Sequence, residues 1–164
     1  EWSNFGELVD TVFLWNVLQR IRGHGSGQPG VGDGRGVGSR GRFEAVAVLR
    51  VRGPRLCRRA LEGALVGFSV PAHEGQSRGW KREQISDTLL LWQLVRSARG
   101  AESRVEREEA LEALDVVARA PPGAEALRWA LEVVGMPEEE RSELRRGAAV
   151  DALRDRLAEE ALAV

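Results

Sequence analysis

The chain contains few of the residues from which disulfide-bonded, zinc-binding and membrane-spanning proteins are built. Its 164 residues include one cysteine, Cys57, which excludes a disulfide within the chain and a zinc site made of several cysteines. A single cysteine is typical of a reducing compartment, so we expect an intracellular location. No apolar run approaches the roughly 20 residues that span a bilayer, so we expect no membrane span.

The N-terminal sequence, Glu1-Trp2-Ser3, has no initiator methionine and no basic segment of the kind that begins a signal peptide. We therefore expect a processed chain or a fragment, from which a targeting segment could already have been removed.

Residues that commonly perform catalysis are also scarce. The two histidines are His24 and His73, and neither has a second histidine at a metal-binding spacing. The sequence shows no set of nucleophile, base and orienting group. We therefore predict no catalytic residue, no metal site and no cofactor, and we favour a protein that is not an enzyme.

Positive charge comes almost entirely from arginine, because Lys81 is the only lysine. Between Arg20 and Arg59 there are ten arginines and two acidic residues, whereas residues 100–164 contain nine arginines and sixteen acidic residues. The chain is therefore basic in its first third and acidic in its last, although its net charge is −1. A GC-rich coding sequence would produce the same preference for arginine and glycine.

Residues 23–42 contain nine glycines in twenty positions. Two stretches, 25–30 and 36–41, match the G-x-G-x-x-G pattern of a dinucleotide-binding loop. That pattern needs a strand before it and a helix after it, and we expect the reverse order here. Such a composition buries too little surface to offset the entropy of ordering, so we interpret 23–42 as a flexible linker.

The alternative role for this region is contact with a nucleic acid, because guanidinium groups neutralise phosphates and stack on bases. No aromatic residue lies between Trp15 and Phe43 to provide stacking. The residues that would carry this alternative are Arg35, Arg40, Arg42, Arg50, Arg52, Arg55, Arg58 and Arg59.

The first element is a helix over residues 4–22, which ends at Gly23. At 100° per residue its apolar side chains lie on every side, with Phe5, Leu8, Val9 and Val12 opposite Leu14, Val17, Leu18 and Ile21. A helix that is apolar all round is buried, either in its own protein or in a partner. The predicted partner-binding residues are Leu8, Val12, Leu14, Trp15, Leu18 and Ile21.

The middle segment, 43–100, has a mixed pattern. Valine-rich residues 42–52 predict a strand, residues 54–65 a helix, and 66–71 a second short strand, which together allow a small β-α-β element. Residues 80–99 predict a helix that stops at Gly100, although the apolar run 88–95 also fits a buried strand.

The last segment, 101–164, has the clearest helical signals. Residues 103–106 (SRVE) form a capping box, and prolines at 121, 122 and 137 separate successive apolar stripes. A final helix either begins after Gly147 or continues unbroken from 138. Residues 109–121 and 125–137 resemble each other, which fits stacked repeats or an antiparallel bundle.

Together these patterns predict a mainly α protein, with a helical hairpin or bundle in its C-terminal third. Its expected parts are an apolar helix (1–22), a linker (23–42), a mixed segment (43–100) and a helical segment (101–164). The function that we favour is a protein-interaction subunit or adaptor that docks helices against a protein partner or a second copy. A nucleic-acid-associated protein is the alternative.

Overall fold

Helices make up all of the regular structure in the described part of the chain. The structure is a computed structural model, and it describes residues 2–23, 37–71, 76–119 and 124–162. These residues contain no strand, which confirms the mainly α class. The helices are α1 (Trp2–Arg22), α2 (Val37–Arg52), α3 (Arg58–Gly67), α4 (Arg82–Arg99), α5 (Arg104–Arg119), α6 (Ala124–Val133), α7 (Glu138–Glu143) and α8 (Arg146–Leu162), with 3₁₀ turns η1 (Gly53–Arg55) and η2 (Gln76–Gly79).

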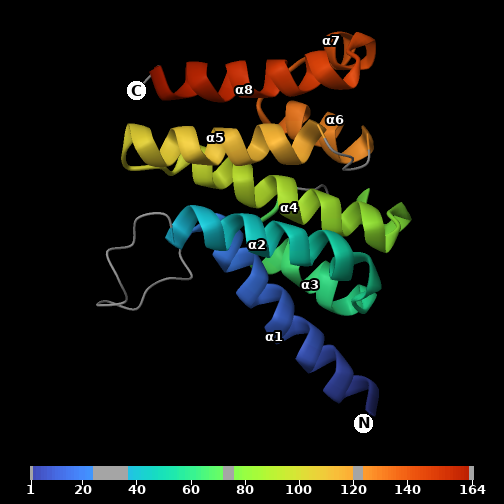
Figure 1. Ribbon diagram of the computed structural model, residues 1–164. Coiled ribbons are helices and arrows are strands. Elements are labelled where there is room, and N and C mark those ends of the chain that lie inside the picture. The colour runs from blue at the N-terminus through green and yellow to red at the C-terminus, as the bar shows by residue number, and fades with distance from the viewer. Residues whose placement is uncertain (1, 24–36, 72–75, 120–123, 163–164) are drawn as a thin grey trace.

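Helix α4 lies at the centre of the molecule (Figure 1). It contacts α1, α2 and α3 on one side and α5, α6 and α8 on the other. Its sequence explains this position, because the buried run from Thr88 to Val95 leaves no polar face for solvent. The prediction of a helix over 80–99 is confirmed, and the alternative of a buried strand is wrong.

The predicted β-α-β element is not present. Residues 42–52, expected to form a strand, belong to α2. Of residues 66–71, expected to form a second strand, the first two end α3 and the rest follow it as a turn and irregular chain. The buried positions of α2 are Arg42, Ala45, Val46 and Leu49. That spacing is helical, so burial of one helix face outweighs the local preference of valine for strands.

The predicted linker at 23–42 is described only at its two ends. Residues 24–36 lie outside the described residues, and α2 already begins at Val37. Gly23 has the left-handed conformation (φ 95°), and its N–H donates to the carbonyl oxygen of Gln19 at 3.0 Å. The predicted end of the first helix at Gly23 is therefore confirmed.

Helix ends in the last segment follow their sequence signals. The N–H of Glu106 donates to Ser103 Oγ at 3.1 Å, while the Glu106 carboxylate accepts from the N–H of Glu102, one residue before the position predicted. Gly135 ends α6 with φ 88°. A break at residues 144 and 145 separates α7 from α8, and Gly147 lies inside α8, so the final helix is not continuous from 138.

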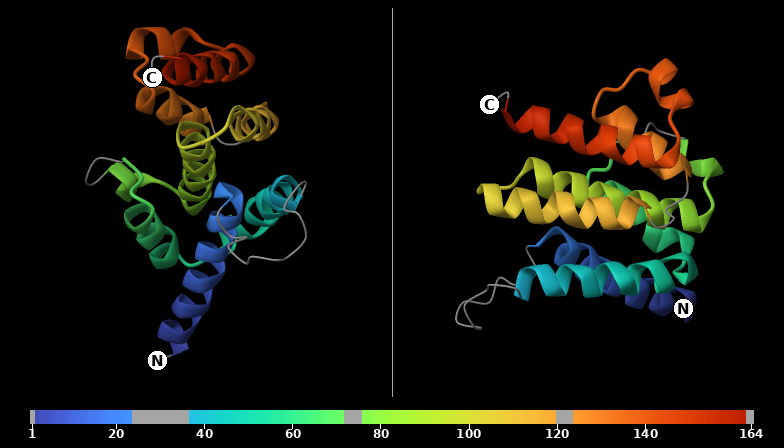
Figure 2. Two further views of the ribbon diagram at one scale, coloured as in Figure 1. Left: turned by 90° about the vertical axis from the view of Figure 1, so that its left-hand side faces the viewer. Right: turned by 45° about the horizontal axis from the view of Figure 1, so that its top comes forward.

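The first half of α1 projects from the rest of the molecule. Figure 1 and the left view of Figure 2 show the N-terminal half of α1 extending beyond α2 and α3, at the far end of the molecule from the C-terminus. The C-terminal half of the same helix packs among α2, α3 and α4. The two halves of α1 therefore have different surroundings.

Candidate functional site

The C-terminal half of α1 is part of the core. Leu14, Val17, Leu18 and Ile21 are all buried. Trp15 is half-buried and its ring packs on Phe68, with the ring centroids 4.4 Å apart. Burial of each large apolar side chain contributes about 1.5–3 kcal/mol, so this half anchors the helix.

Helices α2 and α4 also satisfy the carbonyl groups at the end of α1. Arg42 of α2 donates from Nε to the carbonyl oxygen of Ile21 at 2.8 Å. Ser97 of α4 donates from Oγ to the carbonyl oxygen of Arg22 at 2.9 Å. The last carbonyls of a helix have no partner within it, and a cation there also interacts favourably with the helix dipole. The end of α1 is therefore fixed from two directions.

Two acidic residues fix the rotation of the projecting half about its axis. Asp10 accepts a hydrogen bond through Oδ2 from the backbone N–H of Cys57 at 2.8 Å, at the start of α3. Glu7, one turn earlier, lies 3.5 Å from Arg59 Nη1. Both contacts hold the same side of α1 against α3, so the opposite side must face outward.

That outward side carries four apolar residues, which we call the outer stripe: Phe5, Leu8, Val9 and Val12. Their exposed fractions are 63%, 59%, 49% and 53%. The spacing i, i+3, i+4, i+7 places them in one continuous row over two turns. In a helix with a buried face this is the spacing of the core side, but here the row contacts solvent.

The half of the helix surface centred on the outer stripe carries no charged side chain between residues 5 and 16. Both acidic residues of this segment, Glu7 and Asp10, lie on the side that faces α3. Further along the outer side, Asn16 and Gln19 are exposed and polar. The stripe is therefore bounded in length, because it ends where polar residues replace apolar ones after Val12.

The predicted partner-binding residues divide into two groups in the structure. Leu8 and Val12 are exposed in the outer stripe, whereas Leu14, Leu18 and Ile21 are buried in the chain's own core and Trp15 is half-buried. Phe5 and Val9 were placed on the same side as Leu8 and Val12 by helical periodicity, but were not predicted as binding residues. The contact of Asp10 with α3 shows that Phe5 and Val9 face outward, and a sequence pattern does not contain this contact.

Arg42, one of the predicted nucleic-acid contacts, is buried at the junction of α1 and α2. Burial lowers the pKa of its guanidinium, while Glu109 and Glu106 act in the opposite direction. In the structure its guanidinium caps α1 through the carbonyl oxygen of Ile21.

The other predicted arginines are dispersed. Arg35 and the side chain of Arg40 lie outside the described part of the chain. Arg58 bonds to Glu62 and to the carbonyl oxygen of Trp80, Arg59 contacts Glu7, and Arg52 stacks over Phe13 at 4.3 Å. Arg50 is half-buried and Arg55 is exposed. Nucleic-acid binding by this region stays a prediction that the packing of these side chains does not strengthen.

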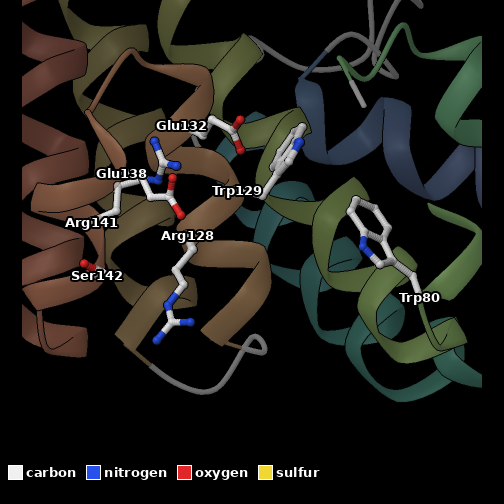
Figure 3. Close-up of a pocket in the computed structure, with 7 residues that line it drawn as sticks. All are labelled: Trp80, Arg128, Trp129, Glu132, Glu138, Arg141 and Ser142. Atoms are coloured by element: carbon white, nitrogen blue, oxygen red, sulfur yellow. The ribbon is translucent and has the colours of Figure 1, made fainter. Parts of the chain in front are cut away.

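A separate pocket of about 310 Å³ lies beside α6 and α7 (Figure 3). Two tryptophans, two arginines, two glutamates and a serine line it: Trp80, Arg128, Trp129, Glu132, Glu138, Arg141 and Ser142. The Ser142 hydroxyl donates to the carbonyl oxygen of Glu139, and among the described residues that line the pocket there is no histidine, cysteine or aspartate. Without a base beside the hydroxyl, these residues do not form a hydrolytic arrangement.

Other candidate chemistry is equally limited within the described ranges. There, no group of three or more His, Cys, Asp or Glu residues is placed to hold a metal ion. His24 and His73 lie outside these ranges. Cys57 is half-buried at the N-cap of α3, where its backbone contacts Asp10. None of the described helices combines the length and apolar character needed to cross a bilayer.

No protein-family model, curated protein or solved structure matches this chain. Within the described residues, the outer stripe is a contiguous apolar row that the fold leaves uncovered.

Proposed function

We propose that the protein is a non-enzymatic interaction subunit or adaptor that docks the outer stripe of α1 against a helix of another chain. The observation that supports this is the exposed row Phe5, Leu8, Val9 and Val12 on a projecting helix whose rotation is fixed by Asp10. An apolar helix face of this spacing is the usual means by which a helix binds a groove or another helix.

The outer stripe differs from the other exposed apolar residues of the described chain. Those are Phe43, Val51, Val66, Val105, Val116 and Leu162. Phe43 and Val51 share one face of α2, two turns apart, with the small exposed Ala47 between them, but none of the six belongs to an i, i+3, i+4, i+7 row of large side chains. Isolated exposed apolar residues are normal on protein surfaces. A contiguous row is different, because one partner can cover all of its members at once.

The free energy available from covering the outer stripe is in the range of weak, reversible binding. Covering apolar surface contributes about 25 cal/mol per Å², and four half-exposed large side chains form a patch on the order of several hundred Å². The helix is already formed and oriented, because Asp10 bonds to the start of α3 and the C-terminal half of α1 packs in the core. Binding therefore costs less entropy.

The test is a substitution that places a charge in the outer stripe. Val12→Asp should abolish retention of partner protein by the immobilised full chain from extracts of the cells that express it. Val105→Asp is the matched control, because Val105 is similarly exposed on α5 in another part of the molecule. Both variants should melt within a few degrees of the wild type, because neither replaces a buried side chain.

The proposal is supported if Val12→Asp loses a protein that the wild type and Val105→Asp retain, or loses self-association that they show. Equal retention by all three chains would contradict it. So would a wild-type chain that neither retains a protein nor self-associates.

A further inference from the structure

We propose that the outer stripe pairs with the outer stripe of a second copy of the chain, antiparallel, about a two-fold axis between Leu8 and Val9. This inference rests on the proposed function, because it names the partner of the same face. In this pair, residue i of one copy lies opposite residue 17 − i of the other.

The outer stripe is complementary to itself in that geometry. Phe5 lies opposite Val12 of the second copy, and Leu8 lies opposite Val9. Each larger side chain therefore faces a smaller, β-branched one, so that the two rows interdigitate. A two-fold pair makes every contact twice, and a single row of four residues provides four cross-helix contacts.

The position of the axis follows from where the stripe ends. Asn16 and Gln19 continue the outer side of α1 and are exposed. If the second copy moved along α1 by one turn, the axis would move two residues toward the C-terminus, and Phe5 would lie opposite Asn16, with an amide group against an aromatic ring. The axis between Leu8 and Val9 covers all four apolar residues and no charged one.

Electrostatics favour the antiparallel orientation over the parallel one. Antiparallel helices place opposite ends of their dipoles side by side. Glu7 and Asp10 are held toward α3 in each copy, so the pairing does not bring their carboxylates together. The parallel arrangement would align the dipoles and place Phe5 against Phe5.

The shape of the molecule leaves room for this pairing. The N-terminal half of α1 extends beyond α2 and α3, and α3 contacts the side opposite the outer stripe (Figure 2). In the antiparallel pair the main bodies of the two copies lie at opposite ends of the paired helices. The buried area, on the order of 800 Å² in total, is small for a specific interface, so we expect a dissociation constant of about 10–100 µM.

Disulfide trapping tests the register directly. In a Cys57→Ser background, which retains the backbone N–H that Asp10 accepts, one chain carries Phe5→Cys and another, with a mass tag, carries Val12→Cys. Residues 5 and 12 lie opposite each other in the proposed pair. Two copies of residue 5 are separated by seven residues along the axis, about 10 Å, which exceeds the reach of a disulfide.

Mild oxidation of the mixed chains at about 200 µM should give the mixed dimer at least about tenfold more abundantly than either same-residue dimer. Equal trapping of same-residue dimers would indicate a parallel or unspecific pair and would overturn the proposal. An absence of trapped dimers would also overturn it. The reduced mixture should melt as the Cys57→Ser chain does, which checks that the fold is intact.

Light scattering separates this inference from the proposed function. The wild type and Val105→Asp should change from monomer to dimer as concentration rises from about 1 to 500 µM, and Val12→Asp should remain a monomer. A wild type that stays monomeric while retaining another protein through the stripe overturns the self-pairing alone. A Val12→Asp chain that dimerises and retains partners as the wild type does overturns both.

Discussion

The two halves of α1 have similar apolar content but different surroundings. Leu14, Val17, Leu18 and Ile21 are buried among α2, α3 and α4, whereas Phe5, Leu8, Val9 and Val12 are half-exposed or more. The difference lies in which neighbours each half has, because the helix itself is continuous from Trp2 to Arg22. An apolar helix can therefore be an anchor at one end and a binding element at the other.

The contacts that anchor α1 also hold its projecting half in one orientation. Capping by Arg42 and Ser97 fixes the end of α1, and the bond from Cys57 N–H to Asp10 fixes its rotation. A projecting helix without these contacts would rotate and fray, and it would lose entropy on binding.

Truncation of an apolar side chain should destabilise the chain in the C-terminal half of α1 but not in the projecting half. Leu18 is fully buried, so Leu18→Ala should lower the free energy of unfolding by about 2–5 kcal/mol. Val12→Ala should change it by no more than about 0.5 kcal/mol in the dilute monomer, because Val12 has few contacts to lose. Urea unfolding at low micromolar concentration measures both. Similar losses in the two variants would show that the stripe is buried within the chain.

Two glycine-to-alanine changes should show that the C-terminal half of α1 is closely packed and that the projecting half is open. Gly67 of α3 lies against the first, and Gly6 lies in the second. A Cβ at Gly67 would lie 2.4 Å from Cζ2 of Trp15, so Gly67→Ala should cost about 1–3 kcal/mol through displacement of the indole. A Cβ at Gly6 would meet nothing within 4 Å, so Gly6→Ala should stabilise the chain by about 0.5–1 kcal/mol. Thermal melts of the two variants should shift in opposite directions, and a destabilised Gly6→Ala chain would contradict the open position.

Removal of the Arg42 cap should weaken the anchor. Arg42→Met keeps much of the side-chain volume but leaves the carbonyl of Ile21 without its donor, which should cost about 1–2 kcal/mol. Amide exchange in the last turn of α1 should rise more than exchange in α5 to α8. A variant as stable as the wild type would show that removing the cost of burying the guanidinium charge offsets the loss of the hydrogen bond.

One buried polar side chain of α4 should stabilise the fold when it is replaced by an apolar one. Gln93 of α4, one turn before Ser97, is fully buried, and neither its amide oxygen nor its amide nitrogen has a hydrogen-bond partner. Gln93→Leu removes both unpaired atoms at similar volume and should raise the free energy of unfolding by about 1 kcal/mol. A destabilising effect of the same size, read from chemical unfolding, would indicate that Gln93 is hydrogen-bonded in solution.

The sequence predicted helices well where their ends are marked by special residues. Gly23 and Gly135 adopt the positive φ that favours glycine, and Ser103 caps α5. The strand predicted for 42–52 is wrong because local valine preference is weaker than burial of a helical face. That face became identifiable only once Ala45 and Leu49 had α1 and α4 to pack against.

The candidate site was predictable in part. Helical periodicity separates Phe5, Leu8, Val9 and Val12 from Leu14, Leu18 and Ile21, but it cannot say which side has a neighbour. That choice depends on Asp10 meeting the N–H of Cys57, a contact between residues 47 positions apart. Long-range contacts of this kind are set by the whole packing arrangement and leave no local pattern.

Amide hydrogen exchange along α1 distinguishes the anchored half of the helix from the projecting half. In the dilute chain, residues 5–12 should exchange at least about 100-fold faster than residues 14–22, because only the second group is held by the core. At concentrations that form the pair, protection should rise in residues 5–12 and stay constant in 14–22. Equal protection of both halves in the dilute chain, or no change in residues 5–12 at any concentration or with any retained partner, would contradict the account.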